Sequence, residues 1–112
     1  MNVLVTGGLG FIGSKVVLQL LKRDISVIIA DVDIEKNRSK LENNINKIGK
    51  DKNLIKYEKL DITSYQNVEK IFQDYNLDSV INLAYGIGAI CEENPLLASR
   101  INIVGTTTIF EM

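Results

Sequence analysis

Short apolar runs alternate along the chain with longer stretches in which apolar residues recur every three or four positions. The runs lie at Asn2–Thr6, Ser26–Ala30, Asn53–Glu58 and Ser79–Ala84. Runs of this length that are rich in β-branched residues predict strands, and near-continuous apolar runs are typical of strands buried on both faces. The alternation therefore predicts an α/β fold, a parallel sheet with helices on both faces.

The first two helical stretches carry apolar stripes and one clear stop signal. The first helix is expected from Phe11 to about Asp24, with its apolar face at Ile12, Val16, Val17, Leu20 and Leu21. The second is expected from Ile34 to Ile48, followed by Gly49 as its C-terminal cap.

Two more helices are expected in the second half of the chain. Thr63 and Gln66 form a capping box that starts a helix burying Val68, Ile71 and Phe72. Asn94 is expected to cap a last helix with Pro95 in its first turn, which runs to the end of the chain. The predicted buried face of this last helix consists of Leu97, Ile101, Val104 and Thr108.

Composition and charge narrow the classes of function. The 112 residues are 46% hydrophobic, and 13 Lys and Arg balance 14 Asp and Glu. This describes one soluble domain with no concentrated basic surface for nucleic acid. No apolar run approaches the roughly 20 residues of a membrane span, and the N-terminus carries no targeting signal, so a cytoplasmic location is expected.

The near absence of histidine and cysteine limits the metal sites and nucleophiles that the chain can form. The chain has no histidine and a single cysteine, Cys91. This excludes zinc sites of the usual Cys/His kind and histidine-based triads, and we expect no metal. No basic residue adjoins Cys91 in sequence, so a structural role is expected for it rather than a nucleophilic one.

A glycine-rich segment, residues 6–13, lies between the first strand and the first helix and reads Thr-Gly-Gly-Leu-Gly-Phe-Ile-Gly. Strand, glycine turn and helix N-terminus are the context in which a dinucleotide is bound. Gly7 and Gly10 let the chain turn sharply and let a pyrophosphate approach the backbone, while Gly13 allows close packing of helix and strand. The free N–H groups at the helix start then bind the anion.

Asp31 follows the second strand, about twenty residues beyond the glycines. A carboxylate at this place accepts hydrogen bonds from both hydroxyls of the adenosine ribose and repels a 2′-phosphate. NAD is therefore favoured over NADP. Lys36 and Arg38 lie nearby in sequence, and their positive charges would weaken that preference. The alternative is that Asp31 is an exposed helix N-cap.

These residues resemble the extended short-chain dehydrogenase/reductase family, the NAD-dependent epimerases and dehydratases. Its signature Thr-Gly-x-x-Gly-x-x-Gly is matched by Thr6, Gly7, Gly10 and Gly13. Leu60-Asp61-Ile62 is similar to the turn after the third strand, where the resemblance implies that Asp61 and the next backbone N–H hold the adenine. The alternative is that Asp61 only caps a turn.

The resemblance extends to the end of the chain. Asn82-Leu83-Ala84 resembles the strand end beneath the nicotinamide ribose and pyrophosphate, and Asn102-x-x-Gly105-Thr106 resembles part of the next helix. Tyr85 stands where the family most often has a small residue, so its ring projects toward cofactor or substrate, or else is a core aromatic. The predicted cofactor-binding residues are Gly7, Gly8, Gly10, Phe11, Ile12, Gly13, Asp31, Asp61, Ile62, Leu83, Ala84, Tyr85 and Asn102.

The catalytic Tyr-x-x-x-Lys of the family is absent, since none of the four tyrosines has a lysine four residues on. In the family this pair lies beyond the helix with which the chain ends. Residues 1–112 are therefore expected to be the N-terminal portion of an NAD-binding Rossmann-type domain, with strand order 3-2-1-4 and without the catalytic and substrate-binding parts. The catalytic residues are unknown.

Three functions stay open. The resemblance implies a nucleotide-sugar epimerase or dehydratase that moves hydride to and from the nicotinamide. The segment Leu83–Pro95 is slightly shorter than in many nucleotide-sugar enzymes, and its Gly88-Ala89 followed by Glu93-Asn94-Pro95 is similar to the threonine dehydrogenase branch, which oxidises a small hydroxy acid. A non-catalytic dinucleotide-sensing module is the third reading. A homodimer through Leu96, Ile103 or Phe110 is possible in each case.

Overall fold

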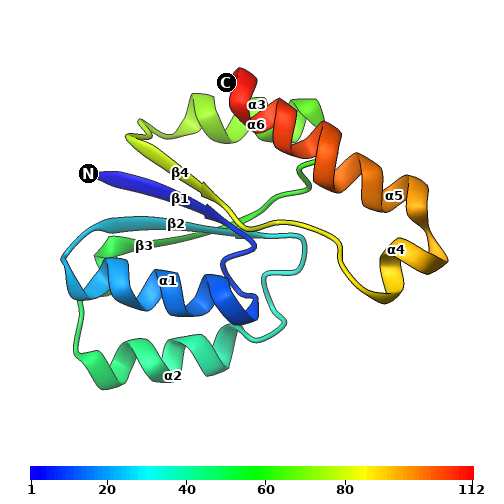
Figure 1. Cartoon of the computed structure of the whole chain (residues 1–112). Helices are drawn as coiled ribbons and strands as arrows, with labels where there is room; N and C mark the ends of the chain where they lie inside the picture. The colour runs from blue at the N-terminus through cyan, green and yellow to red at the C-terminus, as the bar shows by residue number, and fades with distance from the viewer.

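The computed structural model covers residues 1–112 and contains one parallel four-stranded sheet (Figure 1). The strands are β1 (Asn2–Thr6), β2 (Ser26–Asp31), β3 (Ile55–Lys59) and β4 (Ser79–Asn82). Their spatial order is β3-β2-β1-β4, with Thr6 opposite both Ala30 and Asn82. The predicted fold class and strand order are confirmed.

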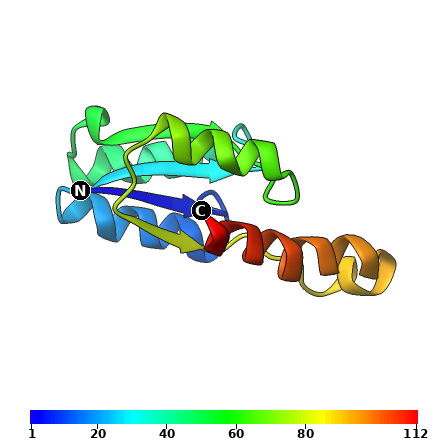
Figure 2. The ribbon, with the colours of Figure 1, turned by 90° about the horizontal axis from the view of Figure 1, so that it is seen from above.

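Helices cover both faces of the sheet (Figures 1 and 2). On one face lie α1 (Phe11–Lys22) and α2 (Arg38–Ile48), and on the other α3 (Tyr65–Asp74) and a long helical segment formed by α5 (Pro95–Ser99), η2 (Arg100–Gly105) and α6 (Thr106–Glu111). The short helix η1 (Lys52–Leu54) precedes β3, and α4 (Ala89–Glu93) lies beyond the carboxyl end of the sheet. None of the helices combines the length and apolar character of a membrane span.

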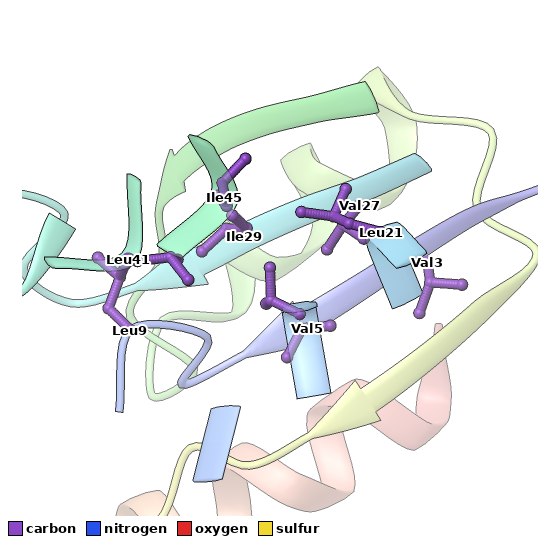
Figure 3. Close-up of a cluster of buried hydrophobic side chains, with 9 residues drawn as sticks. Val3, Val5, Leu9, Leu21, Val27, Ile29, Leu41 and Ile45 are labelled. Carbon is purple, nitrogen blue, oxygen red and sulfur yellow. The ribbon is translucent and has the colours of Figure 1, made fainter. Parts of the chain in front are cut away.

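The sheet separates two hydrophobic clusters because consecutive strand residues point to opposite faces. Val3 and Val5 of β1 contribute to the cluster under α1 and α2, which also includes Leu21 and Ile45 (Figure 3). Leu4 points the other way, into the cluster that α3 and α6 cover. Each core strand therefore stabilises both layers, as expected for a sheet buried on both faces.

The ends of several elements differ from the prediction because side chains bind nearby backbone groups. The helix expected from Ile34 begins only at Arg38, since the Asp33 carboxylate accepts the N–H groups of Glu35 and Lys36 and holds a turn there. Asp51 likewise accepts the N–H of Asn53 and begins η1, which delays β3. Gly49 adopts φ +66° and ends α2, as predicted.

The predicted capping box is wrong by one residue. Ser64, not Thr63, caps α3, and its hydroxyl accepts the N–H of Asn67. The Thr63 hydroxyl is instead bound to Asp61, which removes it from the helix terminus. Val68 and Ile71 are buried in this helix as predicted, and Phe72 packs against the same cluster.

The first and last helices bury a face slightly different from the predicted one. In α1 the buried stripe is Gly13, Val17 and Leu21, whereas Ile12 is 49% exposed because it lies at the cavity described below. In the last helical segment Leu97 and Val104 are exposed, and the buried residues are Ala98, Gly105, Thr108 and Ile109. Thr108 is thus buried as predicted, and Ile101 packs against the cluster that α3 and α6 cover.

Candidate functional site

A cavity of about 740 Å³ opens at the carboxyl ends of the strands. It spans the ends of β3, β2, β1 and β4, and thus includes the point between β1 and β4 where the strand order reverses. The structure brings eleven of the thirteen predicted residues into its wall: Gly7, Gly10, Phe11, Ile12, Gly13, Asp31, Asp61, Ile62, Leu83, Ala84 and Tyr85. Gly8 and Asn102 lie outside the wall.

The glycines of the loop meet different constraints. Gly7 has φ +64°, and a Cβ there would lie 2.7 Å from the carbonyl oxygen of Leu83. A Cβ on Gly13 would overlap the carbonyl oxygen of Gly7, and one on Gly8 would lie 2.9 Å from Ile29. A Cβ on Gly10 would meet only the Gly7 oxygen, at 3.2 Å. The fold therefore requires glycine at three positions, while Gly10 leaves space at the cavity wall.

The N-terminus of α1 faces this cavity with free donors. The N-cap residue Gly10 has no side chain to cap the helix, and the first turn contains no acidic residue. The N–H groups of Phe11, Ile12 and Gly13 have no carbonyl within the helix to bind, because the ladder starts with Ser14 N–H to Gly10 O at 3.0 Å. Three backbone donors and the positive end of the helix dipole form a surface suited to an anion.

Thr6 joins the glycine loop to the segment after β4. Its buried hydroxyl donates to the Asn82 side-chain oxygen and accepts the N–H groups of Leu83 (3.0 Å) and Ala84 (3.2 Å). The Asn82 amide in turn donates to the Thr106 hydroxyl at 3.3 Å. These bonds fix the β4 side of the cavity against the β1 side.

Asp31 is the last residue of β2 and lies in the cavity wall. Its carboxylate accepts the N–H groups of Leu9 (3.2 Å) and Val32 (2.9 Å). The helix N-cap alternative is wrong, because α2 begins seven positions later, after Asn37. Arg38 is bound to Glu42 at 3.0 Å and lies over the Tyr57 ring, so it does not line the cavity.

Asp61 has a structural partner and also lies in the cavity wall. Its Oδ1 accepts the N–H (2.9 Å) and hydroxyl (2.6 Å) of Thr63, so the residue does cap its own turn. The next residue, Ile62, is buried against Gly105, where a Cβ would lie 2.7 Å from the Ile62 side chain. Gly105 therefore lets the last helical segment pack against this end of the cavity.

Tyr85 is 48% exposed and lines the cavity, so the alternative of a core aromatic is wrong. The neighbouring Gly86 is held by Asn102, whose side-chain oxygen accepts the Gly86 N–H and whose amide donates to the Gly86 carbonyl, both at 2.8 Å. The Cys91 thiol donates to the same carbonyl at 3.3 Å. Asn102 and Cys91 thus both bind a backbone group next to the cavity.

Sequence reasoning missed part of the wall. The additional lining residues are Thr6, Ala30, Val32, Leu60, Thr63, Ile87, Ile90, Leu97 and Ile101. Val32 and Thr63 lie within two residues of Asp31 and Asp61, so their closeness to a predicted acid could have identified them as wall residues. Ile90 belongs to α4, a five-residue helix that was not predicted and that carries no capping side chain at its start. The charged side chains of the complete wall are the two carboxylates of Asp31 and Asp61.

Comparisons with known proteins identify the family of the chain. The family model described as GDP-mannose 4,6 dehydratase matches residues 4–112. UDP-glucose 4-epimerase 2 of Arabidopsis thaliana is 38% identical over 113 residues, covering 99% of this chain and 32% of that protein. The chain thus spans about a third of the length of the curated relatives it matches.

Two solved structures share the fold. UDP-glucose 4-epimerase from Bifidobacterium longum, in complex with NAD+ and UDP, has a TM-score of 0.80 at 29% identity, covering 99% of this chain and 32% of that one. L-threonine dehydrogenase from Clostridium difficile has a TM-score of 0.75 at 28% identity, covering 98% of this chain and 32% of that one. The chain therefore belongs to the GDP-mannose 4,6-dehydratase family of NAD-dependent epimerases and dehydratases, and it corresponds to the N-terminal part of these proteins.

Proposed function

We propose that residues 1–112 form the NAD-binding portion of a nucleotide-sugar epimerase or dehydratase. The observation that carries this proposal is the cavity wall, which combines the glycine loop, Asp31 and Asp61 at the β1–β4 reversal. The 38% identical relative is a UDP-glucose 4-epimerase, and a structural neighbour holds NAD+ and UDP, which supports both the cofactor and the substrate class.

The residues present fit a dinucleotide. The free N–H groups of α1 would hold the pyrophosphate, for which Gly10 leaves room. Asp31 would accept the ribose hydroxyls, and Asp61 with the Ile62 N–H would hold the adenine. Bound nicotinamide supplies hydride transfer. The acid–base groups for that reaction are not assigned to any residue of this segment.

NAD is proposed over NADP on electrostatic grounds. A 2′-phosphate beside the Asp31 carboxylate would be repelled, since like charges at close range disfavour binding. Arg38 is engaged with Glu42 and Tyr57, and neither it nor Lys36 lines the cavity, so neither cation compensates for that repulsion there.

The proposal is tested by calorimetric titration of the full-length protein with NAD and with NADP. We expect NAD to bind more tightly, and we expect Gly10→Val and Asp31→Ala to weaken that binding while the circular dichroism spectrum is kept. Unchanged NAD affinity in both variants would show that the site is wrongly assigned.

A dehydrogenase of a small hydroxy acid such as threonine is the second candidate. The structural likeness to L-threonine dehydrogenase and the length of the segment after β4 favour it. The two readings are separated by repeating the NAD titration in the presence of UDP-glucose or threonine. Tighter binding with the nucleotide sugar supports the first reading, and tighter binding with threonine supports the second. A dinucleotide sensor would respond to neither and would lack Tyr-x-x-x-Lys in the full-length protein.

Assembly into a dimer is proposed on a surface feature of the last helical segment. Leu96, Ile103 and Phe110 are seven residues apart on the last helical segment and are 64%, 66% and 82% exposed. Such an apolar stripe supports a homodimer, which sedimentation of the full-length protein against an Ile103→Ser variant would test.

A further inference from the structure

A second cavity, of about 230 Å³, lies between α2 and the edge strand β3. Its wall consists of Arg38, Glu42, Ile45, Asn46, Lys52, Ile55 and Tyr57, and none of these residues lines the cavity at the carboxyl ends of the strands. The volume is several times the roughly 30 Å³ that one water molecule occupies, and it lies below the roughly 300 Å³ at which pockets for drug-sized ligands begin. This second cavity is therefore of a size suited to a small molecule.

Tyr57 brings to this wall a polar group that has no partner. Its hydroxyl oxygen is buried and forms no hydrogen bond. Buried hydroxyl groups in proteins usually have a partner, because leaving one unpaired destabilises the fold. Burial, and then the charge of Glu42, raise the pKa of Tyr57 above its ordinary value of 10.0, so the hydroxyl keeps its proton at neutral pH. The second cavity thus has a hydrogen-bond donor that lacks an acceptor.

Two positive side chains belong to the same wall. The guanidinium of Arg38 lies over the Tyr57 ring, 3.9 Å from its centre, and its Nε donates to Glu42 at 3.0 Å. The Nη2 of Arg38 contacts no carboxylate, and Lys52 forms no ion pair. Two cations therefore face the single carboxylate of Glu42, and donors of both remain available to an acceptor.

Glu42 is the group with which a bound anion would compete. Its side chain is 45% exposed, and its ion pair with Arg38 joins residues one helical turn apart. Exposed pairs of this kind contribute little to stability. An anion with several oxygens can replace Glu42 at the guanidinium, and a further oxygen can then accept the Tyr57 hydroxyl. Guanidinium groups bind carboxylates and phosphates well, because their parallel N–H groups match two oxygens at once.

We propose that the second cavity binds a small oxyanion, a phosphate or a carboxylate, through Arg38, Lys52 and the Tyr57 hydroxyl. The proposed site is independent of the dinucleotide site, since the two share no wall residue. An anion would there occupy the donors that the fold itself leaves unused.

The test is a calorimetric titration of the full-length protein with inorganic phosphate and, separately, with acetate, in the presence of saturating NAD. Bound NAD keeps the probe away from the backbone donors of α1. We expect at least one of the two anions to bind, and we expect Tyr57→Phe to raise its Kd about tenfold and Lys52→Ala to raise it severalfold. Tyr65→Phe is the matched control and should leave the Kd unchanged, because Tyr65 lies outside both cavities.

Glu42→Ala is expected to have the opposite effect and to lower the Kd severalfold, because it removes the competing carboxylate. A site for a cation would instead lose affinity in this variant. Failure of both anions to bind would overturn the inference. Binding that neither Tyr57→Phe nor Glu42→Ala alters would overturn it as well, since the anion would then lie elsewhere.

Thermal unfolding gives a second measurement on Tyr57. In anion-free buffer Tyr57→Phe should not lower the Tm, because the hydroxyl has no bond to lose, whereas added phosphate should raise the Tm of the wild type more than that of the variant. An equal fall in Tm with and without phosphate would show that the hydroxyl is bound within the protein, contrary to the inference. If NAD does not bind, the proposed function fails, and titration of Gly10→Val, whose side chain fills the anion surface at α1, still tests the second cavity.

Discussion

At the scale of single residues, the glycine loop shows that one residue type serves two purposes. Gly7, Gly8 and Gly13 are required by the protein's own packing, since a Cβ at each would meet neighbouring atoms at less than 3 Å. Gly10 has an extended backbone that any residue adopts and only one neighbour near its absent Cβ. A side chain at position 10 would therefore enter the cavity without disturbing the packing of the fold.

Gly13→Ala and Gly10→Ala should therefore have different effects. We expect Gly13→Ala to lower the free energy of unfolding by about 1–3 kcal/mol or more, because its methyl group would overlap the Gly7 carbonyl. Gly10→Ala should leave stability nearly unchanged and weaken NAD binding. Urea unfolding and calorimetry measure the two quantities, and equal loss of stability in both variants would contradict this division.

At the scale of elements, side-chain bonds attach the helices to the sheet at defined points. The Tyr75 hydroxyl, just after α3, donates to the Glu58 carboxylate on β3. Burial, and then this hydrogen bond, raise the pKa of Tyr75 to about 12 from its ordinary value of 10.0. The folded protein therefore holds this proton more tightly than the unfolded chain.

This attachment predicts a pH dependence of stability. Its contribution is fully present below pH 10 and is lost as the pH rises from 10 to about 12, because the unfolded chain releases the proton first. Tyr75→Phe should therefore show a shallower fall in unfolding free energy over this range than the wild type. Denaturant unfolding at several pH values measures the slope, with Tyr65→Phe as the control that should keep the wild-type slope.

At the scale of the whole molecule, the strands of the sheet differ in how many neighbouring strands they have. The inner strands β1 and β2 have a neighbour on each side, whereas β4 is an edge strand beside only β1. Val80 and Ile81 of β4 are partly buried, and Ser79 is exposed. An edge with unpaired backbone groups and apolar side chains favours pairing with another chain.

We expect residues 1–112 expressed alone to associate through this edge. Static light scattering should show a mass that rises with concentration, and Ser79→Lys should reduce the rise, because a charged side chain disfavours edge-to-edge pairing. An association that is insensitive to Ser79→Lys and abolished by Ile103→Ser would assign it to the apolar stripe of the last helical segment instead.

The strand order was predictable from sequence, and so was the gathering of eleven named residues at one cavity, because both depend on local signals. Apolar runs mark β1 and β2, and the spacing from Gly7 to Asp31 follows from one strand–helix–strand unit. The ends of α2 and α3 were not predictable, since they depend on which of several neighbouring polar side chains binds the backbone. The Asn102–Gly86 contact joins residues 16 positions apart, and neither it nor the π-helical turn follows from a local sequence pattern.

The surface that the glycine loop offers to an anion is main chain, since the only charged side chains in the cavity wall are two carboxylates. Peptide N–H groups are common to all residues except proline, so this surface is inherited with the fold. Most point mutations in the helix and strands leave these N–H groups in place. Substitutions at a few glycines of the loop would displace them, because a Cβ there would collide with neighbouring atoms. Sequence divergence elsewhere in the chain is therefore expected to leave this main-chain surface in place.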